Sequence, residues 1–363
     1  MASVGLTRLL ITAQANVAWL TGFGGSAGAV LVEPDGLTLV TDHRYAEECQ
    51  ALAAAAGLRV VVVAQTYDET LAGLIRAGED LIGFEAGHLT VHRQRWLRAT
   101  LEGVGWPPDR LRPTLNLVEA GRIVKDAWEI ERFREAGRLI SAVAIGILAD
   151  LAPGVREQDV AQAIEAGLRR SGSSRPAFDT IVASGPRSAL PHGRASDRVM
   201  AAGDLVVLDF GGVYGGYCVD LTRTAELGIL SVEAGRVHAA VAEAQEAAIA
   251  AIAPGVPAAE VDRAARDTLA RHGLADRFVH GTGHGLGLDV HEAPRLGPSR
   301  PAVHPPLSGT VPVPEVLAAG MVVTVEPGVY IPGWGGIRIE DDLLVTESGA
   351  ERLTRVPVAL GRG

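Results

Sequence analysis

The sequence of 363 residues has little of several features that mark particular classes of protein. Its only cysteines are Cys49 and Cys218, too few for a disulfide framework, which fits a reducing cytoplasm. No apolar run reaches the length of about 18 residues that a transmembrane helix needs. Residues 1–20 lack the charged segment followed by an apolar block that marks a signal peptide. We therefore expect a cytoplasmic protein that has no membrane partner.

Aromatic side chains and positive charge are also scarce. Aromatic residues make up 4% of the chain, so the core must be built mainly from Ala, Val, Leu and Ile. The net charge of −10 argues against nucleic acid as the main partner. Hydrophobic residues at 47% and charged residues at 21% are typical of a globular protein, and the length suggests two domains.

The N-terminal part alternates short apolar runs with helical patterns, which predicts a mixed α/β domain. AVLVE and LTLVT flank Pro34-Asp35-Gly36, a turn signal, and together predict a β-hairpin. Residues 45–56 and 67–77 have helical patterns, and the apolar run 58–64 between them predicts a buried strand.

A long helix is predicted from about Asp126 to Leu151, because apolar residues recur near one of its faces. We place the domain boundary just before this helix. The predicted domains are therefore residues 1–122 and residues 123–363. The apolar residues of the helix are Ile130, Phe133, Ile140, Val143, Ile147 and Leu151.

The C-terminal domain contains an internal repeat. LAPGVREQDVAQAIEAGLRRSG at 151–172 matches IAPGVPAAEVDRAARDTLARHG at 252–273, with an offset of 101. GDLVVLD at 203–209 then matches GMVVTVE at 320–326, with an offset of 117. Short Ala/Gly/Val matches can arise by chance, but an ordered series of them favours a true repeat. The growth of the offset predicts additional residues in the second half, for which the Pro- and Ser-rich segment 296–316 is the candidate.

Two aspartates stand out in apolar runs of this domain. Asp209 ends the run LVVLD, and Asp220 lies in a second run, YCVDL. A two-residue turn at Tyr214-Gly215 would make the two carboxylates direct cross-strand neighbours, with Cβ atoms about 4.5–5.5 Å apart. Facing aspartates destabilise an apolar hairpin unless cations compensate their charge. The alternative, two solvated acids on an exposed face, is disfavoured by the apolar residues on either side.

Two glutamates and a histidine extend this set. Glu326 and Glu340, in TVEPGVY and RIEDD, form a second acidic pair, and the repeat places Glu326 opposite Asp209. His284 lies in GTGHGLG, where glycines let the backbone pack closely against a site. Four carboxylates and one imidazole suit two ions of Mn, Co, Zn or Fe better than a structural zinc site.

Three further histidines adjoin these candidate ligands. His192 follows Leu190-Pro191 in a loop, His280 precedes the glycine run, and His291 follows it. A lone histidine is more often a hydrogen-bonded structural residue than a catalytic one. Their position favours a functional role for His192 and His291, whereas both interpretations stay open for His280.

Together these motifs resemble the creatinase/aminopeptidase P/prolidase superfamily, the "pita-bread" metallopeptidases. The resemblance covers nearly the whole chain, and the ligand order Asp, Asp, His, Glu, Glu is matched in full. It implies an α/β (α+β) fold with a creatinase-type domain at 1–122 and a pita-bread catalytic domain with a pseudo-two-fold repeat at 123–363. It also implies a homodimer with two divalent metal ions per subunit, manganese in preference to zinc or cobalt.

The resemblance implies a role for each matching residue. The family's substrate-facing histidines match His192 and His291, and its proline-pocket histidine matches His280. Its Arg-Ile-Glu motif and the tyrosine after its Glu-Pro-Gly motif match Arg338 and Tyr330, which implies that these two residues bind substrate. The family's metal ligands match Asp209, Asp220, His284, Glu326 and Glu340.

In the implied metal site, Asp209 and Asp220 lie on a first ion and His284 on a different one, with Asp220 and Glu340 bridging. Elementary chemistry agrees with such a site. Two ions about 3.5–4 Å apart lower the pKa of a shared water, so that hydroxide can attack the scissile carbonyl. A histidine donor to the developing oxyanion is worth about 2.7–4 kcal/mol. Glu326 can move the proton of the water to the leaving nitrogen.

Within the family, the sequence favours the Xaa-Pro branch. The domain at 1–122 and Arg338 disfavour methionine aminopeptidase, and the complete ligand set disfavours creatinase-type enzymes and non-catalytic peptide-binding homologues. Two alternatives remain, both acting on short proline-containing peptides. A dipeptidase (prolidase) closes its site behind proline, whereas aminopeptidase P accepts longer peptides.

The segment 296–316 favours the dipeptidase, because its length is similar to that in eukaryotic-type prolidases. Those enzymes place an arginine in this loop to bind the carboxylate of the dipeptide. The stretch before Gly320 has no arginine at the matching place, and Arg295, Arg300 or His304 could substitute. A surface loop that contacts another subunit is the alternative.

Overall fold

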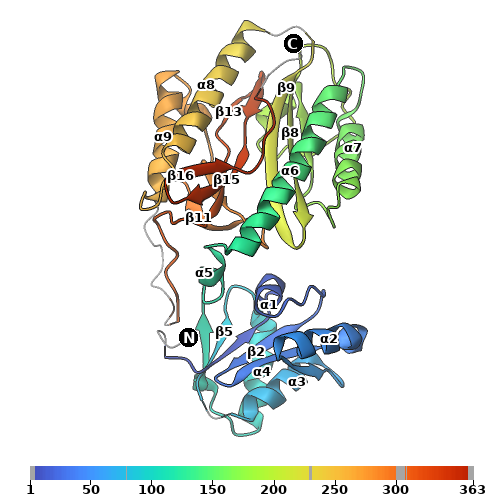
Figure 1. The fold of residues 1–363 in the computed structure, drawn as a ribbon, viewed down its shortest axis with the longest axis vertical. Helices are drawn as coiled ribbons and strands as arrows, with labels where there is room; N and C mark the ends of the chain where they lie inside the picture. Colours follow the sequence, from blue (N-terminus) through green and yellow to red (C-terminus); the bar gives the residue numbers. More distant parts are fainter. Residues whose placement is uncertain (1–4, 79, 229–230, 300–306, 308, 359–363) are drawn as a thin grey trace. The chain divides into compact units, whose positions relative to one another are not determined.

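The computed structural model describes residues 5–78, 80–228, 231–299, 307 and 309–358 (Figure 1). Arg300, His304 and the residues between them lie outside the described residues. The chain forms two compact units. Unit 1 comprises the described residues up to Arg122 together with those between 307 and 313, and unit 2 comprises the rest. No helix of the described part is long and apolar enough to cross a membrane.

Unit 1 is built on a six-stranded sheet with the strand order β4-β3-β2-β1-β5-β6. The predicted hairpin is confirmed as β2 and β3, and the predicted helices and strand at 45–77 as α2, β4 and α3. Thr66 and Thr90 cap α3 and α4 by accepting a backbone N–H in the first turn. The elements are β1 (Arg8–Ile11), α1 (Gln14–Thr21), β2 (Ala29–Glu33), β3 (Gly36–Thr41), α2 (Ala46–Ala56), β4 (Arg59–Val62), α3 (Tyr67–Arg76), β5 (Ile82–Glu85), α4 (Val91–Gly103), β6 (Leu111–Thr114) and α5 (Glu119–Arg122).

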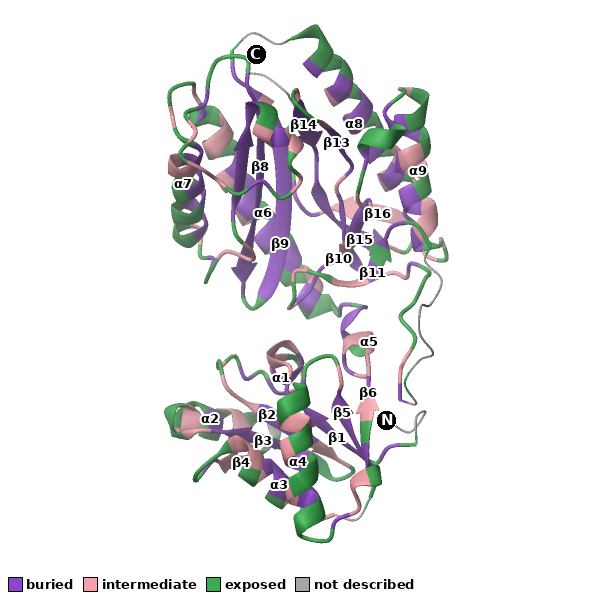
Figure 2. Cartoon of the chain, turned by 180° about the vertical axis from the view of Figure 1, so that it is seen from behind, coloured by how far each residue is buried: buried purple, intermediate pink, exposed green. Residues whose placement is uncertain are grey.

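Helices cover both faces of this sheet. Successive side chains of a strand point to opposite faces, so that apolar neighbours in one strand are buried in two separate clusters. Leu10 packs with Leu71 of α3 and Leu97 of α4. Its neighbour Leu9 packs with Val17 of α1 in a second apolar cluster. In Figure 2 the central strands are accordingly buried, and the outer faces of the helices are exposed.

Unit 2 consists of two similar halves. In the first half, α6 and α7 pack against the three-stranded sheet β7-β8-β9, and in the second half, α8 and α9 pack against the sheet β11-β10-β12-β15-β16 (Figure 1). The hairpin β13-β14 completes the unit. The elements are α6 (Ala127–Asp150), α7 (Glu157–Arg170), β7 (Ile181–Ser184), β8 (Leu205–Tyr214), β9 (Tyr217–Glu226), α8 (Val232–Ala250), α9 (Ala258–Arg271), β10 (Gly283–Gly285), β11 (Glu292–Leu296), β12 (Val322–Val325), β13 (Gly328–Ile331), β14 (Gly335–Arg338), β15 (Asp341–Thr346) and β16 (Gly349–Arg352).

The predicted repeat is confirmed in detail. Helices α7 and α9 begin and end at residues that differ by 101. Before them, the amide of Gly154 donates to Met200 O and the amide of Gly255 donates to Leu317 O, each at 2.8 Å. The offset is 101 for the donors and 117 for the acceptors, as the sequence predicts. The residues added in the second half therefore lie before Leu317.

The predicted long helix is confirmed as α6. Asp126 forms a capping box with Glu129, in which each side chain accepts a hydrogen bond from the backbone amide of the other residue. Phe133 and Ile140 of the predicted apolar face are fully buried against the first half of the unit. The cap defines where the helix begins, and its apolar face anchors it to the sheet.

The predicted register of the β8-β9 hairpin is wrong. The turn is formed by Gly215 and Gly216, with φ of 56° and 92°, and not by Tyr214-Gly215. A tight turn of this kind needs positive φ at both central residues, which glycine adopts freely and tyrosine does not. Asp220 therefore faces Gly211, and its carboxylate lies diagonally from Asp209 instead of directly opposite.

Candidate active site

The fold brings the predicted site residues of unit 2 to one cavity of about 630 Å³. His192, His280, His291 and Arg338 line it, and Tyr330 is connected to it by hydrogen bonds to His280 and Arg338. All five predicted metal ligands also line the cavity. They are Asp209 on β8, Asp220 on β9, His284 on β10, Glu326 after β12 and Glu340 before β15.

Three of these ligands converge closely enough to share one ion. One side-chain atom each from Asp220, His284 and Glu340 lies within 4.8 Å of the others. His284 Nε2 also lies 3.7 Å from Glu326 Oε1. Asp220 Oδ1 and Glu340 Oε1 are buried and have no hydrogen-bond partner among the described residues. Buried carboxylate oxygens need a hydrogen-bond donor or a cation as partner. A divalent cation that takes oxygen and nitrogen ligands fits this group of side chains.

The electrostatics of the carboxylates lead to the same conclusion. Burial, and then the charge of Glu340, raise the pKa of Asp220 well above its usual range. Burial and the neighbouring carboxylates act in the same direction on Glu326, and they raise the pKa of Glu340 to about 8. Without a cation, the cluster can therefore carry its full negative charge only at a high free-energy cost.

The imidazole of His284 is oriented for metal binding. Its Nδ1 donates a hydrogen bond to Gly285 O at 3.0 Å, which leaves the lone pair of Nε2 facing the carboxylates. Burial lowers its pKa to about 4, so the ring is neutral at physiological pH. His291 packs edge-on against this ring, with the centroids 4.3 Å apart.

Arg338 donates hydrogen bonds to other groups of the protein from all three nitrogens of its guanidinium. Its Nη2 donates to Asp209 Oδ2 at 2.5 Å, and its Nη1 donates to Tyr330 Oη at 2.6 Å and to Pro191 O at 3.2 Å. Its Nε donates to Thr222 Oγ1 at 3.3 Å. These contacts favour a role in orienting Asp209 and Tyr330 over the direct contact with substrate that the sequence suggests.

A neutral hydrogen-bonded chain continues from Arg338. His280 Nδ1 donates to Gly281 O at 2.8 Å, so Nε2 accepts from the hydroxyl of Tyr330 at 2.9 Å. Burial lowers the pKa of His280 to about 4 and raises that of Tyr330 to about 12. Both side chains are therefore uncharged near neutral pH, and His280 is the one of the two that lines the cavity with the metal ligands.

Comparison with known proteins agrees with this arrangement. Residues 131–347 match the model of metallopeptidase family M24, and residues 1–124 match the creatinase/prolidase N-terminal domain. The chain belongs to metallopeptidase family M24. The predicted resemblance is thereby confirmed, and with it the prediction of a metallopeptidase.

Several M24 relatives match over nearly the full length of the chain. An uncharacterized peptidase of Bacillus subtilis, YqhT, is 38% identical, over 98% of this chain and 96% of its own. The solved structure of an Xaa-Pro dipeptidase from Bacillus anthracis is 38% identical with a TM-score of 0.90, covering 99% of this chain and 96% of its own. That of an X-Pro aminopeptidase from Thermotoga maritima is 32% identical with a TM-score of 0.86, covering 99% of both chains.

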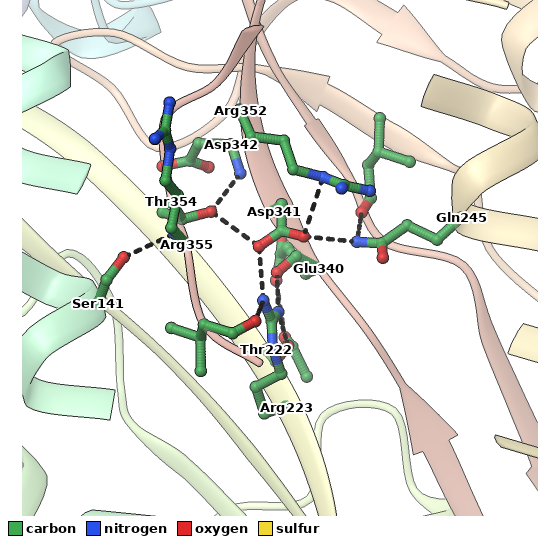
Figure 3. Close-up of polar contacts among 12 residues, drawn as sticks. Ser141, Thr222, Arg223, Gln245, Glu340, Asp341, Asp342, Arg352, Thr354 and Arg355 are labelled. Atoms are coloured by element: carbon green, nitrogen blue, oxygen red, sulfur yellow. Dashed lines mark hydrogen bonds and ion pairs between the residues drawn. The ribbon is translucent and has the colours of Figure 1, made fainter. Parts of the chain in front are cut away.

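The structure adds an arginine and two aspartates that sequence reasoning missed (Figure 3). Arg223 Nη1 donates to the backbone oxygen of Glu340 at 2.6 Å, and its Nη2 donates to Asp341 Oδ1 at 2.7 Å. Asp342 Oδ2 accepts the backbone amide of Asp220 at 3.0 Å. These contacts hold the backbone of Glu340 and Asp220, two of the predicted metal ligands, in place.

Further polar side chains complete this network. Gln245 Nε2 and Thr354 Oγ1 donate to the Asp341 carboxylate at 3.1 and 2.9 Å (Figure 3). Burial raises the pKa of Asp342 well above its usual range. In the sequence, Asp341 and Asp342 are signalled by the run of acids after Ile339, which continues into the apolar LLV instead of a polar loop.

We expect the metal-free M24 protein to lose stability as the pH rises from about 6.5 to about 8. In this window the folded state binds more protons than the unfolded state, because the pKa of Glu340 rises from 4.5 to about 8 on folding, whereas His280 and His284, whose pKa falls to about 4 on folding, are largely neutral in both states. The sign is therefore a loss of stability with rising pH. Since 1 kcal/mol corresponds to roughly 2–4 °C for a domain of about 150–250 residues, the size range of unit 2, a fall of several degrees in Tm is expected.

Thermal unfolding between pH 6.5 and 8, with a chelator or with saturating Mn²⁺, measures this effect. Mn²⁺ should raise Tm most at the upper end of the range. Glu340→Gln should flatten the metal-free profile. A metal-free Tm that is constant or rises with pH would contradict the assignment.

Proposed function

We propose that this M24 protein is an Xaa-Pro dipeptidase, which hydrolyses the bond between an N-terminal residue and a following proline. The observation that carries the proposal is the cavity in which five metal-ligand side chains meet, with Asp220 Oδ1 and Glu340 Oε1 buried and without partners in the described part. The likeness to an Xaa-Pro dipeptidase supports the substrate class. The complete ligand set disfavours a non-catalytic peptide-binding protein.

In this proposal two divalent ions are held by the five ligands Asp209, Asp220, His284, Glu326 and Glu340. We propose manganese in preference to zinc or cobalt, because oxygen ligands predominate. When bound, such ions supply Lewis acidity toward the scissile carbonyl and the attacking water.

Side chains of the chain handle the protons and orient the substrate. Glu326 lines the cavity, where its carboxylate can take the proton of the water and deliver it to the proline nitrogen. His192 and His291 line the same cavity and can each donate an N–H to the carbonyl oxygen as negative charge develops there. Burial lowers the pKa of His291, so it donates as a neutral ring. His280, which accepts a hydrogen bond from Tyr330, provides the surface against which the proline ring packs.

Arg295 is the side chain that we assign to the carboxylate of the dipeptide. It lies on β11, lines the cavity and is exposed. It makes no hydrogen bond or ion pair with any residue that the structure describes. Arg194, the other exposed cation of the cavity, is already paired with Asp179 at 2.9 Å.

The competing function is that of an Xaa-Pro aminopeptidase, which cleaves longer peptides. The likeness to the X-Pro aminopeptidase of Thermotoga maritima favours it, because its TM-score is close to that of the dipeptidase. Hydrolysis of Ala-Pro against Ala-Pro-Ala and a pentapeptide, with Mn²⁺ supplied, distinguishes the two. We expect cleavage of the dipeptide, and efficient cleavage of the longer peptides would favour the aminopeptidase.

We expect Arg295→Gln to raise KM for Ala-Pro by about 10–100-fold, because it removes a charge-assisted hydrogen bond worth about 1.5–3 kcal/mol. The matched control is Arg194→Gln, which removes an exposed arginine of the same cavity that is already paired. An equal rise of KM in both variants would mean that the cavity only attracts the dipeptide through its general charge.

We also propose that the protein is a cytoplasmic homodimer. Both cysteines, Cys49 and Cys218, are buried free thiols, as a reducing compartment favours. Sedimentation velocity over a range of protein concentrations tests the dimer.

A further inference from the structure

The segments that carry His192 and His280 are each held by a buried carboxylate from a helix of the repeat. Glu157 opens α7 in the first half and Asp262 lies on α9 in the second half (Figure 1). Their side chains are 0% and 3% exposed, respectively. A carboxylate buried to this degree must be satisfied by several donors, and here the donors come from the segments that carry the histidines.

Glu157 ties together the two ends of the segment that carries His192. Its Oε1 accepts from the amide and the hydroxyl of Ser184 at 2.8 and 2.7 Å. Its Oε2 accepts from the amide and the hydroxyl of Ser196 at 3.0 and 2.5 Å. Arg187, inside this segment, donates Nε to Glu157 at 3.2 Å and Nη2 to Arg194 O at 2.5 Å. Glu157 therefore connects both ends of residues 184–196 through a single side chain.

Asp262 does the same for the segment that carries His280. Its Oδ1 accepts from the amide and the hydroxyl of Thr282 at 3.0 and 2.9 Å, and its Oδ2 accepts from Arg266 Nε at 2.7 Å. Arg266 then donates to the backbone oxygen of Phe278 at 3.1 Å and to that of His280. The guanidinium also lies over the Phe278 ring, 4.4 Å from its centroid.

The two arrangements are chemically alike but are not copies of each other through the repeat. With the offset of 101, Glu157 corresponds to Ala258, and Asp262 corresponds to Ala161. Each half has therefore placed an acid at a different position of its helix and paired it with an arginine. In both cases the arginine that pairs with the acid also donates to backbone oxygen of the segment that carries the histidine.

We propose that Glu157–Arg187 and Asp262–Arg266 are positioning pairs that hold His192 and His280 at the substrate cavity. The inference rests on the proposed function, because it takes both histidines to face the substrate. The carboxylates act through the backbone of each segment and touch no substrate themselves. Loosening Glu157 frees His192, whose role is to stabilise developing charge, whereas loosening Asp262 frees His280, which packs beside the proline ring.

The test uses Glu157→Gln and Asp262→Asn in the full-length protein, with Arg187→Lys and Arg266→Lys as milder variants that keep the charge. The matched controls are Asp159→Asn on α7 and Glu260→Gln on α9, which break exposed pairs with Arg156 and Arg263 on the same helices. Hydrogen exchange measured by mass spectrometry reads the local order without any substrate.

We expect faster exchange in residues 184–196 only in the Glu157 and Arg187 variants, and in residues 278–284 only in the Asp262 and Arg266 variants. With Ala-Pro as substrate, Glu157→Gln should lower kcat, and Asp262→Asn should chiefly raise KM. Each change should be about tenfold to hundredfold, as expected when a catalytic or binding group is displaced by roughly 1 Å. The control variants should match the wild type in both measurements.

Unchanged exchange in both segments would overturn the proposal, and so would equal kinetic changes in the control variants. A purely structural role would lower Tm and speed exchange throughout unit 2, without the split between kcat and KM. If the wild-type protein does not cleave Ala-Pro, the proposed function fails. The exchange measurement then still decides whether the pairs hold these two segments.

Discussion

Asp220→Ala removes the bound metal and lowers kcat by roughly three orders of magnitude or more, as expected when an essential catalytic group is lost. Asp220 is buried, and one of its oxygens lies within 4.8 Å of ligand atoms from His284 and Glu340. Glu340→Ala should have the same effect. Elemental analysis after dialysis gives the metal content, and hydrolysis of Ala-Pro gives the activity.

The isosteric Asp220→Asn separates metal binding from folding. It removes one buried negative charge but preserves the side-chain volume, so the metal-free protein should become more stable although its metal is lost. The control is Asp267→Ala, which removes an exposed carboxylate of α9. Full activity of either Asp220 variant without bound metal would rule out the metal-dependent mechanism.

Arg338→Met should weaken metal binding by about 10–100-fold, because Asp209 loses the cation that orients it. Breaking a buried ion pair from one side costs about 3–5 kcal/mol, so the free energy of unfolding should fall by a similar amount. Arg338→Lys should restore part of both losses. Metal titration of the dialysed protein and chemical denaturation measure the two effects.

This experiment distinguishes an orienting arginine from one that binds substrate. If Arg338 only contacted the peptide, KM would rise and the metal affinity would stay that of the wild type. The matched control is Arg236→Met, which breaks an exposed arginine–carboxylate pair with Glu233 on α8. Such exposed pairs contribute about 0–1 kcal/mol, so the control should unfold like the wild type.

The long helix α6 and the repeat follow from local rules and could be read from the sequence. Asp126 and Glu129 stand at the spacing of a capping box, and the apolar residues that follow share one helical face. The matching stretches of α7 and α9 keep the same length and the same flanking glycines. These features depend on residues close together in the chain, which is why the sequence determines them.

Apolar alternation alone did not determine the register of the β8-β9 hairpin. Apolar alternation is compatible with a turn at Tyr214-Gly215 or at Gly215-Gly216, and the two differ only in which residue must adopt positive φ. The second is correct, because both of its central residues are glycines. The pattern identified Asp209 and Asp220 as neighbours, but the backbone geometry of the turn decided how they face each other.

By itself, the sequence determined the fold class, the repeat and the set of side chains with metal-binding chemistry, because residue type and periodicity carry that information. Only the tertiary structure decided how these side chains are used. Arg338 is engaged with Asp209, Asp342 holds the backbone of Asp220, and Glu157 spans a loop, all through contacts between residues far apart in the chain. Such contacts depend on how the elements pack, and no local pattern of residues encodes them.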